Sequence, residues 1–274
     1  MTVDLHFHST ASDGTLAPKE LAEKTKGFKA AALTDHDTAD GVAEFLSSEI
    51  GADRRFSGCE FSISTPKEYG EFHLLALNFD INSDRVHSLF ERIVKGRDER
   101  NIKMIERLIE IGIPITKEMV YKYAGGNILG RPHIAHAIIE VGAASNITDA
   151  FEKYLVKGAT GYVERYRPEA KEVFDVIHAS GGVALMAHPK FWTPDVALLK
   201  SGLKELKAQG LDGIEAIYVQ NEIEDTISHL NIARELDFCV SAGSDFHGGN
   251  KVTQKFGMEI DESISGIRWV FDMI

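Results

Sequence analysis

Short apolar runs alternate with segments of helical periodicity along most of the chain, and this alternation constrains the fold more than any other feature. Such alternation is typical of parallel α/β architecture, in which each helix packs back over the sheet. We expect an α/β fold with a βα barrel of about seven strands. The expected strands are residues 2–8, 30–33, 56–64, 72–79, 183–187, 213–219 and 238–242. The expected helices are residues 18–26, 38–49, 83–112, 132–141, 147–155, 168–179, 198–209 and 222–236.

The middle of the sequence breaks this pattern. Residues 81–166 have helical periodicity and almost no strand signal. A chain of 274 residues is long enough for one large domain or two modest ones. We therefore expect a barrel formed by residues 1–80 and 167–274, with residues 81–166 inserted as a helical cap domain.

Composition excludes several classes of protein. The 30 Lys and Arg residues against 42 Asp and Glu residues give a net charge of −12. This charge disfavours a broad grip on the phosphate backbone, so duplex DNA is not an expected partner. No run approaches the roughly 20 apolar residues of a membrane helix, so no membrane association is expected. The two cysteines, Cys59 and Cys239, argue against a disulfide framework and for a reducing compartment, the cytoplasm.

Side chains that bind metals recur in or just after the predicted strands. His6 and His8 are two residues apart on one strand, so both side chains leave the same face. One histidine near a strand end is more often structural, and Asp35 and Asp37 are equally consistent with turn or helix caps. Burying many ionisable groups together costs several kcal/mol each unless cations compensate them, so we predict a metal site. Its expected ligands are His6, His8, Asp13, His36, Glu60, His73, His188, Asp245 and His247.

The motifs around these residues resemble those of the polymerase-and-histidinol-phosphatase (PHP) superfamily. The segment Gly130-Arg131-Pro132-His133-Ile134-Ala135 also resembles its nucleotide-phosphatase branch, so the similarity extends into the insertion. The resemblance implies a distorted seven-stranded βα barrel of the PHP type that carries three metals. The motifs that carry it are His6-Phe7-His8, Thr34-Asp35-His36-Asp37, the Glu60 strand, Ala187-His188-Pro189 and Gly243-Ser244-Asp245-Phe246-His247.

The same resemblance implies how the ligands are shared. Spacing alone supports one shared cluster, and mixed imidazole and carboxylate ligands suit Mn, Zn or Fe. We expect two or three such divalent metals, which lower the pKa of bound water towards about 7 and so supply a nucleophile for phosphorus. Catalytic roles are expected for Glu60, Asp245 and His188. One metal would take His6, His8, Glu60 and Asp245; a second Glu60, His73 and His188; a third Asp13, His36 and His247.

Polar residues interrupt the apolar stripe of the long helix at 83–112. Arg97, Arg100 and Asn101 fall inside that stripe, and polar groups on a packing face need partners. Since the arginine fork suits a phosphate, we expect these three residues to bind substrate together with Arg131 and His133. The alternative is that they pair with acidic residues of the barrel.

The expected function is metal-dependent hydrolysis of a phosphate ester on a small nucleotide or a short RNA end. The branch that the chain resembles removes the 3′-phosphate of 3′,5′-bisphosphonucleotides or trims short RNA from its 5′ end. One alternative is a cyclic phosphodiesterase or a sugar-phosphate or histidinol-phosphate phosphatase. An alternative of another class is a non-catalytic metal-binding module. The sequence leaves open the physiological substrate, the native metal, the oligomeric state and the roles of Asp35, Asp37, Lys190 and Asn221.

Overall fold

The computed structural model describes residues 1–66, 68–124, 130–251 and 254–274. The chain divides into two compact units. Unit 1 comprises Met1–Phe90 and Pro168–Ile274, and unit 2 comprises Glu91–Arg167. Unit 1 has a mixed α/β fold, and unit 2 contains helices and no strand among its described residues. None of the described helices is both long and apolar enough to span a bilayer.

Two sheets form the framework of unit 1. Their strand orders are β3-β2-β1-β9 and β10-β8-β7-β6-β5-β4. The first sheet contains β1 (Thr2–Asp4), β2 (Ala30–Ala32), β3 (Arg54–Phe56) and β9 (Met258–Glu259). The second contains β4 (Gly58–Ile63), β5 (Phe72–Leu77), β6 (Val183–Met186), β7 (Gly213–Tyr218), β8 (Cys239–Gly243) and β10 (Arg268–Trp269).

The alternation predicts parallel strands throughout, but some of these strands are antiparallel. Strand β5 runs antiparallel to both β4 and β6. The connection from β4 to β5 covers only residues 64–71, whereas a parallel crossover needs about a dozen residues or more, so the chain returns as a hairpin. Strand β9 is also antiparallel to its neighbour β1.

The two sheets adjoin at two places. Beyond Asp4 the Leu5 amide donates to the Ala242 carbonyl at 3.0 Å, while the Phe7 carbonyl still accepts from the Thr34 amide at 3.0 Å. The segment after β1 therefore bonds to both sheets, and β1 ends at Asp4 instead of continuing to residue 8. On the other side, the Glu60 amide donates to the Asp35 carbonyl at 3.1 Å. The described strands form sheets of four and six members with these bridges between them, rather than one continuous seven-stranded sheet.

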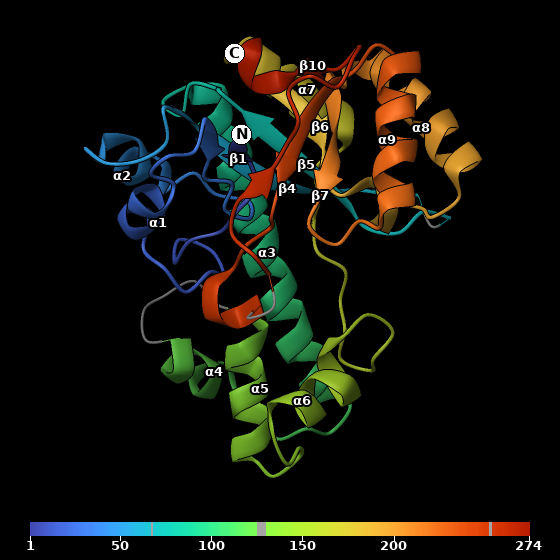
Figure 1. Cartoon of the computed structure of the whole chain (residues 1–274). Coiled ribbons are helices and arrows are strands. Elements are labelled where there is room, and N and C mark those ends of the chain that lie inside the picture. The colour runs from blue at the N-terminus through green and yellow to red at the C-terminus, as the bar shows by residue number, and fades with distance from the viewer. Residues whose placement is uncertain (67, 125–129, 252–253) are drawn as a thin grey trace. The chain divides into compact units, whose positions relative to one another are not determined.

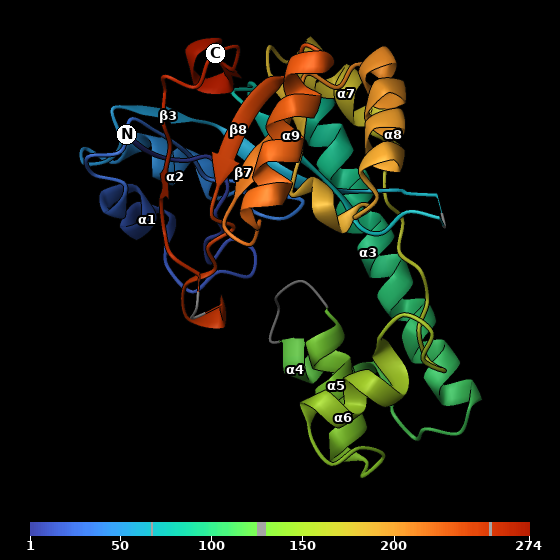
Figure 2. The ribbon, with the colours of Figure 1, turned by 45° about the vertical axis from the view of Figure 1, so that its right-hand side comes forward.

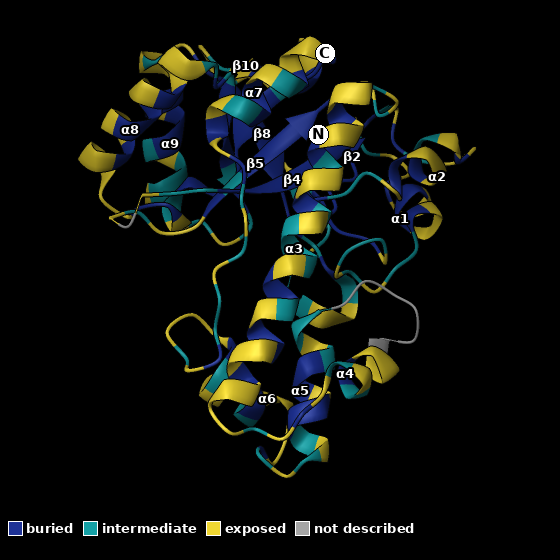
Figure 3. Ribbon diagram, turned by 180° about the vertical axis from the view of Figure 1, so that it is seen from behind, coloured by how far each residue is buried: buried dark blue, intermediate teal, exposed yellow. Residues whose placement is uncertain are grey.

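Helices cover unit 1 in two groups (Figures 1 and 2). Helices α7, α8 and α9 gather beside the β6–β7 part of the second sheet, and α1 and α2 lie beside β1–β3. Figure 3 shows the strands as buried, while the helices turn exposed residues outwards. The bounds are α1 (Pro18–Lys24), α2 (Val42–Ser47), α7 (Ala170–Ala179), α8 (Val196–Gln209) and α9 (Ile223–Glu235).

The core under α1 and α2 fixes the direction of the first motif. Phe7 is fully buried, and its ring meets those of Phe45 and Phe256 with centroids 5.6 Å and 5.2 Å apart. Since side chains alternate along an extended segment, His6 and His8 project away from this core. Both are fully buried all the same, so they lie in a second, polar interior.

Unit 2 has its own apolar core. The long helix α3 (Asp84–Glu110) continues into it, and there Met104, Ile105 and Leu108 pack with residues of α4 (Lys117–Ala124) and α5 (Arg131–Glu140). The expected helix 147–155 is divided into α6 (Ile147–Ala150) and a π-helical turn (Phe151–Leu155). Helix α4 was not predicted.

Candidate metal centre

Glu60 lies at the centre of a polar cluster inside unit 1. Its side chain, on β4, is fully buried. Among the described residues, five imidazoles have a ring nitrogen within 3.3 Å of one of its two carboxylate oxygens. Oε2 lies 3.3 Å from His6 Nε2, 3.3 Å from His8 Nε2 and 2.9 Å from His36 Nδ1, and Oε1 lies 2.9 Å from His73 Nδ1 and 3.0 Å from His188 Nε2.

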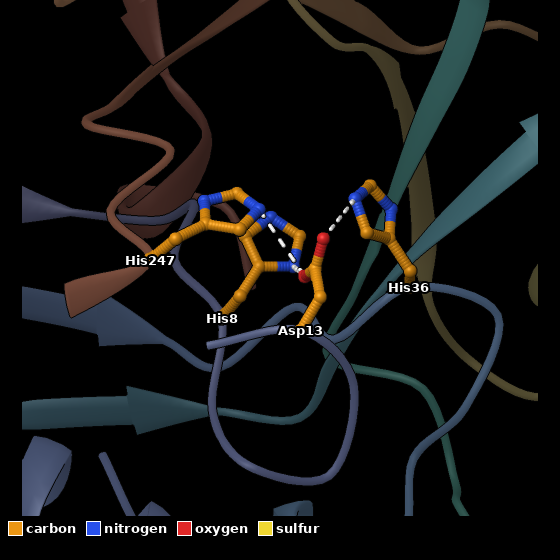
Figure 4. Close-up of side chains that lie close together, drawn as sticks. All are labelled: His8, Asp13, His36 and His247. Atoms are coloured by element: carbon orange, nitrogen blue, oxygen red, sulfur yellow. Dashed lines mark ion pairs between the residues drawn. The ribbon is translucent and has the colours of Figure 1, made fainter. Parts of the chain in front are cut away.

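The segment after β8 contributes the next two side chains. Asp245 Oδ1 lies 3.2 Å from His8 Nε2. His247 Nδ1 donates to the Asp245 carbonyl at 2.7 Å, which leaves Nε2 directed at Asp13 Oδ1, 3.2 Å away. Figure 4 shows how His8, Asp13, His36 and His247 converge, with Asp13 between His247 and His36. Residues from both ends of the chain thus meet in one site.

Three overlapping groups of these side chains could each hold a metal ion. Within each group, one ligand atom per residue lies within 4.8 Å of all the others. The first group is the set expected for the first metal, and the second is the third-metal set joined by His8. In the last group His36 accompanies Glu60 and His73, while His188 Nε2 remains 3.0 Å from Glu60. The groups are His6, His8, Glu60 and Asp245; His8, Asp13, His36 and His247; and His36, Glu60 and His73.

The hydrogen bonding of the cluster fits a bound cation. Buried polar atoms normally have a partner, yet His6 Nε2, both ring nitrogens of His8 and Glu60 Oε2 have no hydrogen bond within the described chain. His6 Nε2 and His8 Nε2 both face Glu60 Oε2 at 3.3 Å, and His8 Nδ1 lies 3.9 Å from Asp13 Oδ1. Their lone pairs are those that a divalent metal would take up, so the cluster is able to bind metal.

The pKa values of the cluster reflect its crowded charges. Although burial raises it, the pKa of Glu60 is held well below its usual range by His6, His36 and His73. Burial alone would lower the pKa of His6, but Glu60 and Glu215 raise it well above its ordinary value. The pKa of His36 is raised as well, so without metal the protons on His6 and His36 offset part of the carboxylate charge. A metal that binds here must displace those protons.

Strained backbone holds several of these residues at strand ends. Asp37, His188 and Asp245 have φ angles of 55°, 28° and 52°, a region that residues other than glycine rarely adopt. Each comes just after an extended segment, where the chain must turn sharply to aim a side chain inwards. Such conformations persist only where the surrounding structure fixes the residue.

Buried carboxylates behind the cluster were missed by sequence reasoning. Asp4 accepts from the Ser244 amide at 3.0 Å and from its hydroxyl at 2.6 Å, which anchors the segment that carries Asp245. Burial raises the pKa of Asp4 to about 6. Glu215, on β7, accepts from His6 Nδ1 at 3.0 Å. The available signal for Glu215 was a single acid among the apolar residues of its strand.

Two aspartates whose roles were open anchor loops. Asp35 accepts from the Ser9 amide at 2.7 Å, the Ser9 hydroxyl at 2.6 Å and the Ser12 hydroxyl at 2.5 Å. It thereby fixes the loop that leads to Asp13. Asp37 Oδ1 accepts from the Ser62 amide at 2.9 Å. Both carboxylates are buried and act as backbone anchors.

The other two open residues also have structural partners. Lys190 Nζ donates to the Gln220 carbonyl at 2.6 Å and to Asp225 Oδ2 at 2.8 Å. Asn221 Nδ2 donates to the Ala216 carbonyl at 3.1 Å. The Lys190 bonds connect the segment after β6 with the start of α9, and the Asn221 bond ties the loop after β7 back to that strand.

The polar residues predicted to bind substrate lie in unit 2. Arg100 is 8% exposed, and its Nε has no hydrogen bond within the described chain. Burial, Arg131 and Arg165 lower its pKa to about 10. Burial, with Arg165, also lowers the pKa of Arg131. His133 Nδ1 accepts from the Gly130 amide at 3.0 Å, at the start of α5. Unit 2 therefore contains a cluster of partly buried cations.

Comparison with known proteins identifies the family of this chain. The PHP domain family matches residues 4–188, a range that starts just before His6 and ends at His188. The chain belongs to the PHP domain family. The family and the enzyme class expected from the sequence, a metal-dependent phosphoesterase, are thereby confirmed.

Relatives of this PHP chain with named activities align with most of its length. It is 34% identical over 249 residues to 5′-3′ exoribonuclease Rnm of Escherichia coli, covering 89% of this chain and 84% of the other. It is 29% identical to the 3′,5′-nucleoside bisphosphate phosphatase of Chromobacterium violaceum, covering 89% and 87%. A solved structure from Bifidobacterium adolescentis, described as a metal-dependent phosphoesterase, has a TM-score of 0.74 at 30% identity and covers 95% and 92%.

Proposed function

We propose that this PHP protein hydrolyses a phosphate monoester or diester at the end of a nucleotide or short RNA. The convergence of eight ligand-type side chains around Glu60 carries this proposal. The exoribonuclease and bisphosphate phosphatase names of its relatives support the substrate class. The net charge of −12 favours a small phosphorylated partner over duplex DNA. Both cysteines are free thiols, which supports a cytoplasmic location.

The proposed cofactor is a set of two or three divalent ions of Mn, Zn or Fe. Such ions supply positive charge for the phosphoryl oxygens and lower the pKa of water, to about 7 in zinc enzymes. Mixed imidazole and carboxylate donors support these metals over Mg, which prefers more oxygen ligands. The proposed ligands are His6, His8, Asp13, His36, Glu60, His73, His188, Asp245 and His247.

Among these ligands we assign direct catalytic roles to Glu60, His188 and Asp245. Glu60 presents both oxygens to different imidazoles, so it can serve two metals at once. Asp245 Oδ2 accepts from the Tyr218 hydroxyl at 3.0 Å and from Lys251 Nζ at 2.8 Å, which leaves Oδ1 facing the histidines. Burial and Asp245 raise the pKa of Tyr218, so its phenol remains a donor.

Exposure indicates the side from which substrate would approach. The side chains of His6, His8 and Glu60 are fully buried. Those of His36 and Asp13 are 27% and 56% exposed, so water and substrate reach the cluster from their side. A phosphate ester entering there would place its departing oxygen against bound cations, which stabilise the charge that develops on it.

The second phosphate of the substrate has a proposed site in unit 2, formed by Arg97, Arg100, Asn101, Arg131 and His133. The pKa of Arg100 is lowered to about 10 by burial, Arg131, Arg165 and Arg97, so an anion would relieve both its desolvation and the repulsion between the arginines. A phosphate is such an anion, and the guanidinium fork can bind two of its oxygens. This supports a role in selecting bisphosphorylated substrates.

The finer architecture is proposed as well. We propose that the two sheets of unit 1 together form the distorted PHP barrel, formed by residues 1–80 and 167–274, and that residues 81–166 are a cap domain. The hydrogen bonds between the sheets, at Leu5 and Glu60, support the barrel. The compact units, with bounds at Phe90 and Pro168, support the cap.

A hydrolysis screen with added Mn tests the function; it measures released phosphate for the monoesters and the nucleotide products by chromatography for the cyclic nucleotides and the RNA. The substrates are 3′,5′-bisphosphonucleotides, mononucleotides, cyclic nucleotides, sugar phosphates, histidinol phosphate and short 5′-phosphorylated RNA. We expect the highest kcat/KM on the bisphosphonucleotides or the RNA, and loss of activity in Glu60→Ala. Preference for a cyclic or sugar phosphate would overturn the proposed substrate class. Bound metal with no turnover on any ester would overturn hydrolysis itself.

A further inference from the structure

Glu215 is a charged residue in the interior of unit 1 that none of the proposed ligand sets uses. It is fully buried in β7, between apolar neighbours. Oε1 accepts from His6 Nδ1 at 3.0 Å, and Oε2 accepts from the His188 amide at 2.8 Å. Both oxygens are therefore committed to residues of the cluster.

We propose that Glu215 is a positioning residue that orients His6 and His188 together for metal binding. The proposal rests on the proposed metal site. In the partition expected above, these two histidines serve different metals with Glu60 as the bridge. Glu215 would thus couple the two sites through the protein, on the side opposite to the bridging carboxylate.

The bond to His6 decides which ring nitrogen faces the cluster. A proton on Nδ1 is donated to Glu215, so Nε2 is directed at Glu60 Oε2, 3.3 Å away. Metal-binding histidines commonly donate their second nitrogen to a carboxylate, which fixes the tautomer and the ring orientation. The other ring nitrogen of His6, Nε2, already lies among the cluster atoms, so the ring is held on that side as well.

The bond to His188 holds a strained backbone. The φ of 28° at His188 lies in the left-handed region that favours glycine. Its amide is fixed by Glu215 Oε2, and its side chain then places Nε2 3.0 Å from Glu60 Oε1. The same carboxylate therefore stabilises a main-chain turn and a side-chain direction at two separate strand ends.

Only a carboxylate satisfies both contacts. His6 Nδ1–H and the His188 N–H are both donors, so both positions around residue 215 must be acceptors. Glutamine has one acceptor oxygen and a donor NH₂ group. Whichever way it turns, one of the two histidines faces a donor and loses its bond.

Packing against β8 confirms that the arrangement is tight. A Cβ atom at Gly243 would lie 2.3 Å from Glu215 Oε1 and 2.3 Å from the Cβ of His6. Glycine is thus required beside the Glu215–His6 pair. A methyl group at residue 243 must push Glu215 and His6 apart, although neither residue is replaced. This offers a second way to break their contact.

Metal titration in competition with a chromophoric chelator tests the proposal without reference to catalysis. Glu215→Gln should bind Mn and Zn about 10- to 100-fold more weakly than the wild-type protein. Gly243→Ala should weaken binding in the same direction. Circular dichroism and thermal melts establish the folded fraction, and titrations are referred to it.

The controls separate positioning from general destabilisation. Gly182→Ala crowds the Leu77 carbonyl at the end of β5 and the Phe79 side chain after it, outside the cluster, and should lower the melting temperature with unchanged metal affinity. Unchanged affinity in Glu215→Gln would overturn the proposal whatever Gly243→Ala does, because the methyl group at residue 243 also crowds the ligand His6 directly. Equal weakening in Gly182→Ala would overturn it too, because the effect would then reflect stability alone. If the wild-type protein binds no metal, the proposed function fails instead.

Discussion

Replacing Arg100 by methionine should reduce activity on bisphosphorylated substrates and at the same time stabilise the protein. Lowering the pKa of Arg100 from 12.5 to about 10 corresponds to a cost of about 3 kcal/mol for keeping its guanidinium charged, at about 1.4 kcal/mol per pKa unit. Methionine keeps a long apolar stem and removes that charge. We expect about 1 kcal/mol of this cost to be recovered, which raises the melting temperature by about 2–4 °C.

The loss of activity follows from the proposed phosphate contact. A hydrogen bond from a charged donor contributes about 1.5–3 kcal/mol, so kcat/KM on a 3′,5′-bisphosphonucleotide should fall about 10- to 150-fold. On p-nitrophenyl phosphate, which has no second phosphate, the loss should be far smaller. Arg107→Met, an exposed arginine on the same helix, is the matched control and should change neither substrate much.

Steady-state kinetics on both substrates and thermal melts of the three proteins decide the matter. Equal losses on both substrates, together with a lowered melting temperature, would refute the reasoning. Arg100 would then be a structural ion-pair residue of the insertion, the alternative that the sequence left open. Metal content should stay unchanged in every case, because no arginine is proposed as a ligand.

Three further predictions concern the cluster and the thiols. Glu60→Gln keeps the size of the side chain but removes the bridging charge. Elemental analysis should therefore find less bound metal, and phosphate release should fall at least 100-fold. Full metal content together with full turnover would contradict this prediction. Burial lowers the pKa of His36 but the surrounding carboxylates, Glu60 foremost, raise it to about 9 from 6.5. Its proton therefore stabilises the metal-free protein fully below pH 6.5, and this contribution is lost as the pH rises through about 9. Metal affinity should increase over the same pH range, with proton release measured by calorimetry. A metal affinity that does not change with pH would contradict this prediction. Burial raises the pKa of Cys59 well above its ordinary value and that of Cys239 to about 12, so neither thiol should react with a disulfide reagent at pH 8 until the protein unfolds; rapid labelling of the native protein would disprove this.

The positions of the ligand-type residues were predictable because they follow local rules. His6 and His8 share a face through the two-residue period of extended chain, and that holds even though the strand itself ends at Asp4. His188 and Asp245 come just after buried apolar runs, which mark strand ends in any α/β fold. The convergence of these residues on Glu60 needed only the topology.

Other features depend on contacts that no local pattern reveals. Strands β9 and β10 have two residues each, too few for alternation to show. The antiparallel direction of β5 depends on the short connection at residues 64–71, which the alternation of apolar runs and helical segments does not reveal. Glu215 and Asp4 looked like isolated acids, and only the fold reveals that their partners are the His6 ring and Ser244.

The long separation along the chain between the two halves of unit 1 determines the order in which the protein can fold. Asp4 and Ser244 are 240 positions apart, and the cluster beside them is complete only when β8 has joined β1. Unit 2 is continuous from residue 91 to 167, so it can fold before residues 168–274 of unit 1 have been synthesised. Pairing over such a separation is slow because the loop must first close. During synthesis, the nascent chain therefore carries an incomplete set of ligand-type imidazoles until the segment after β8 has been made.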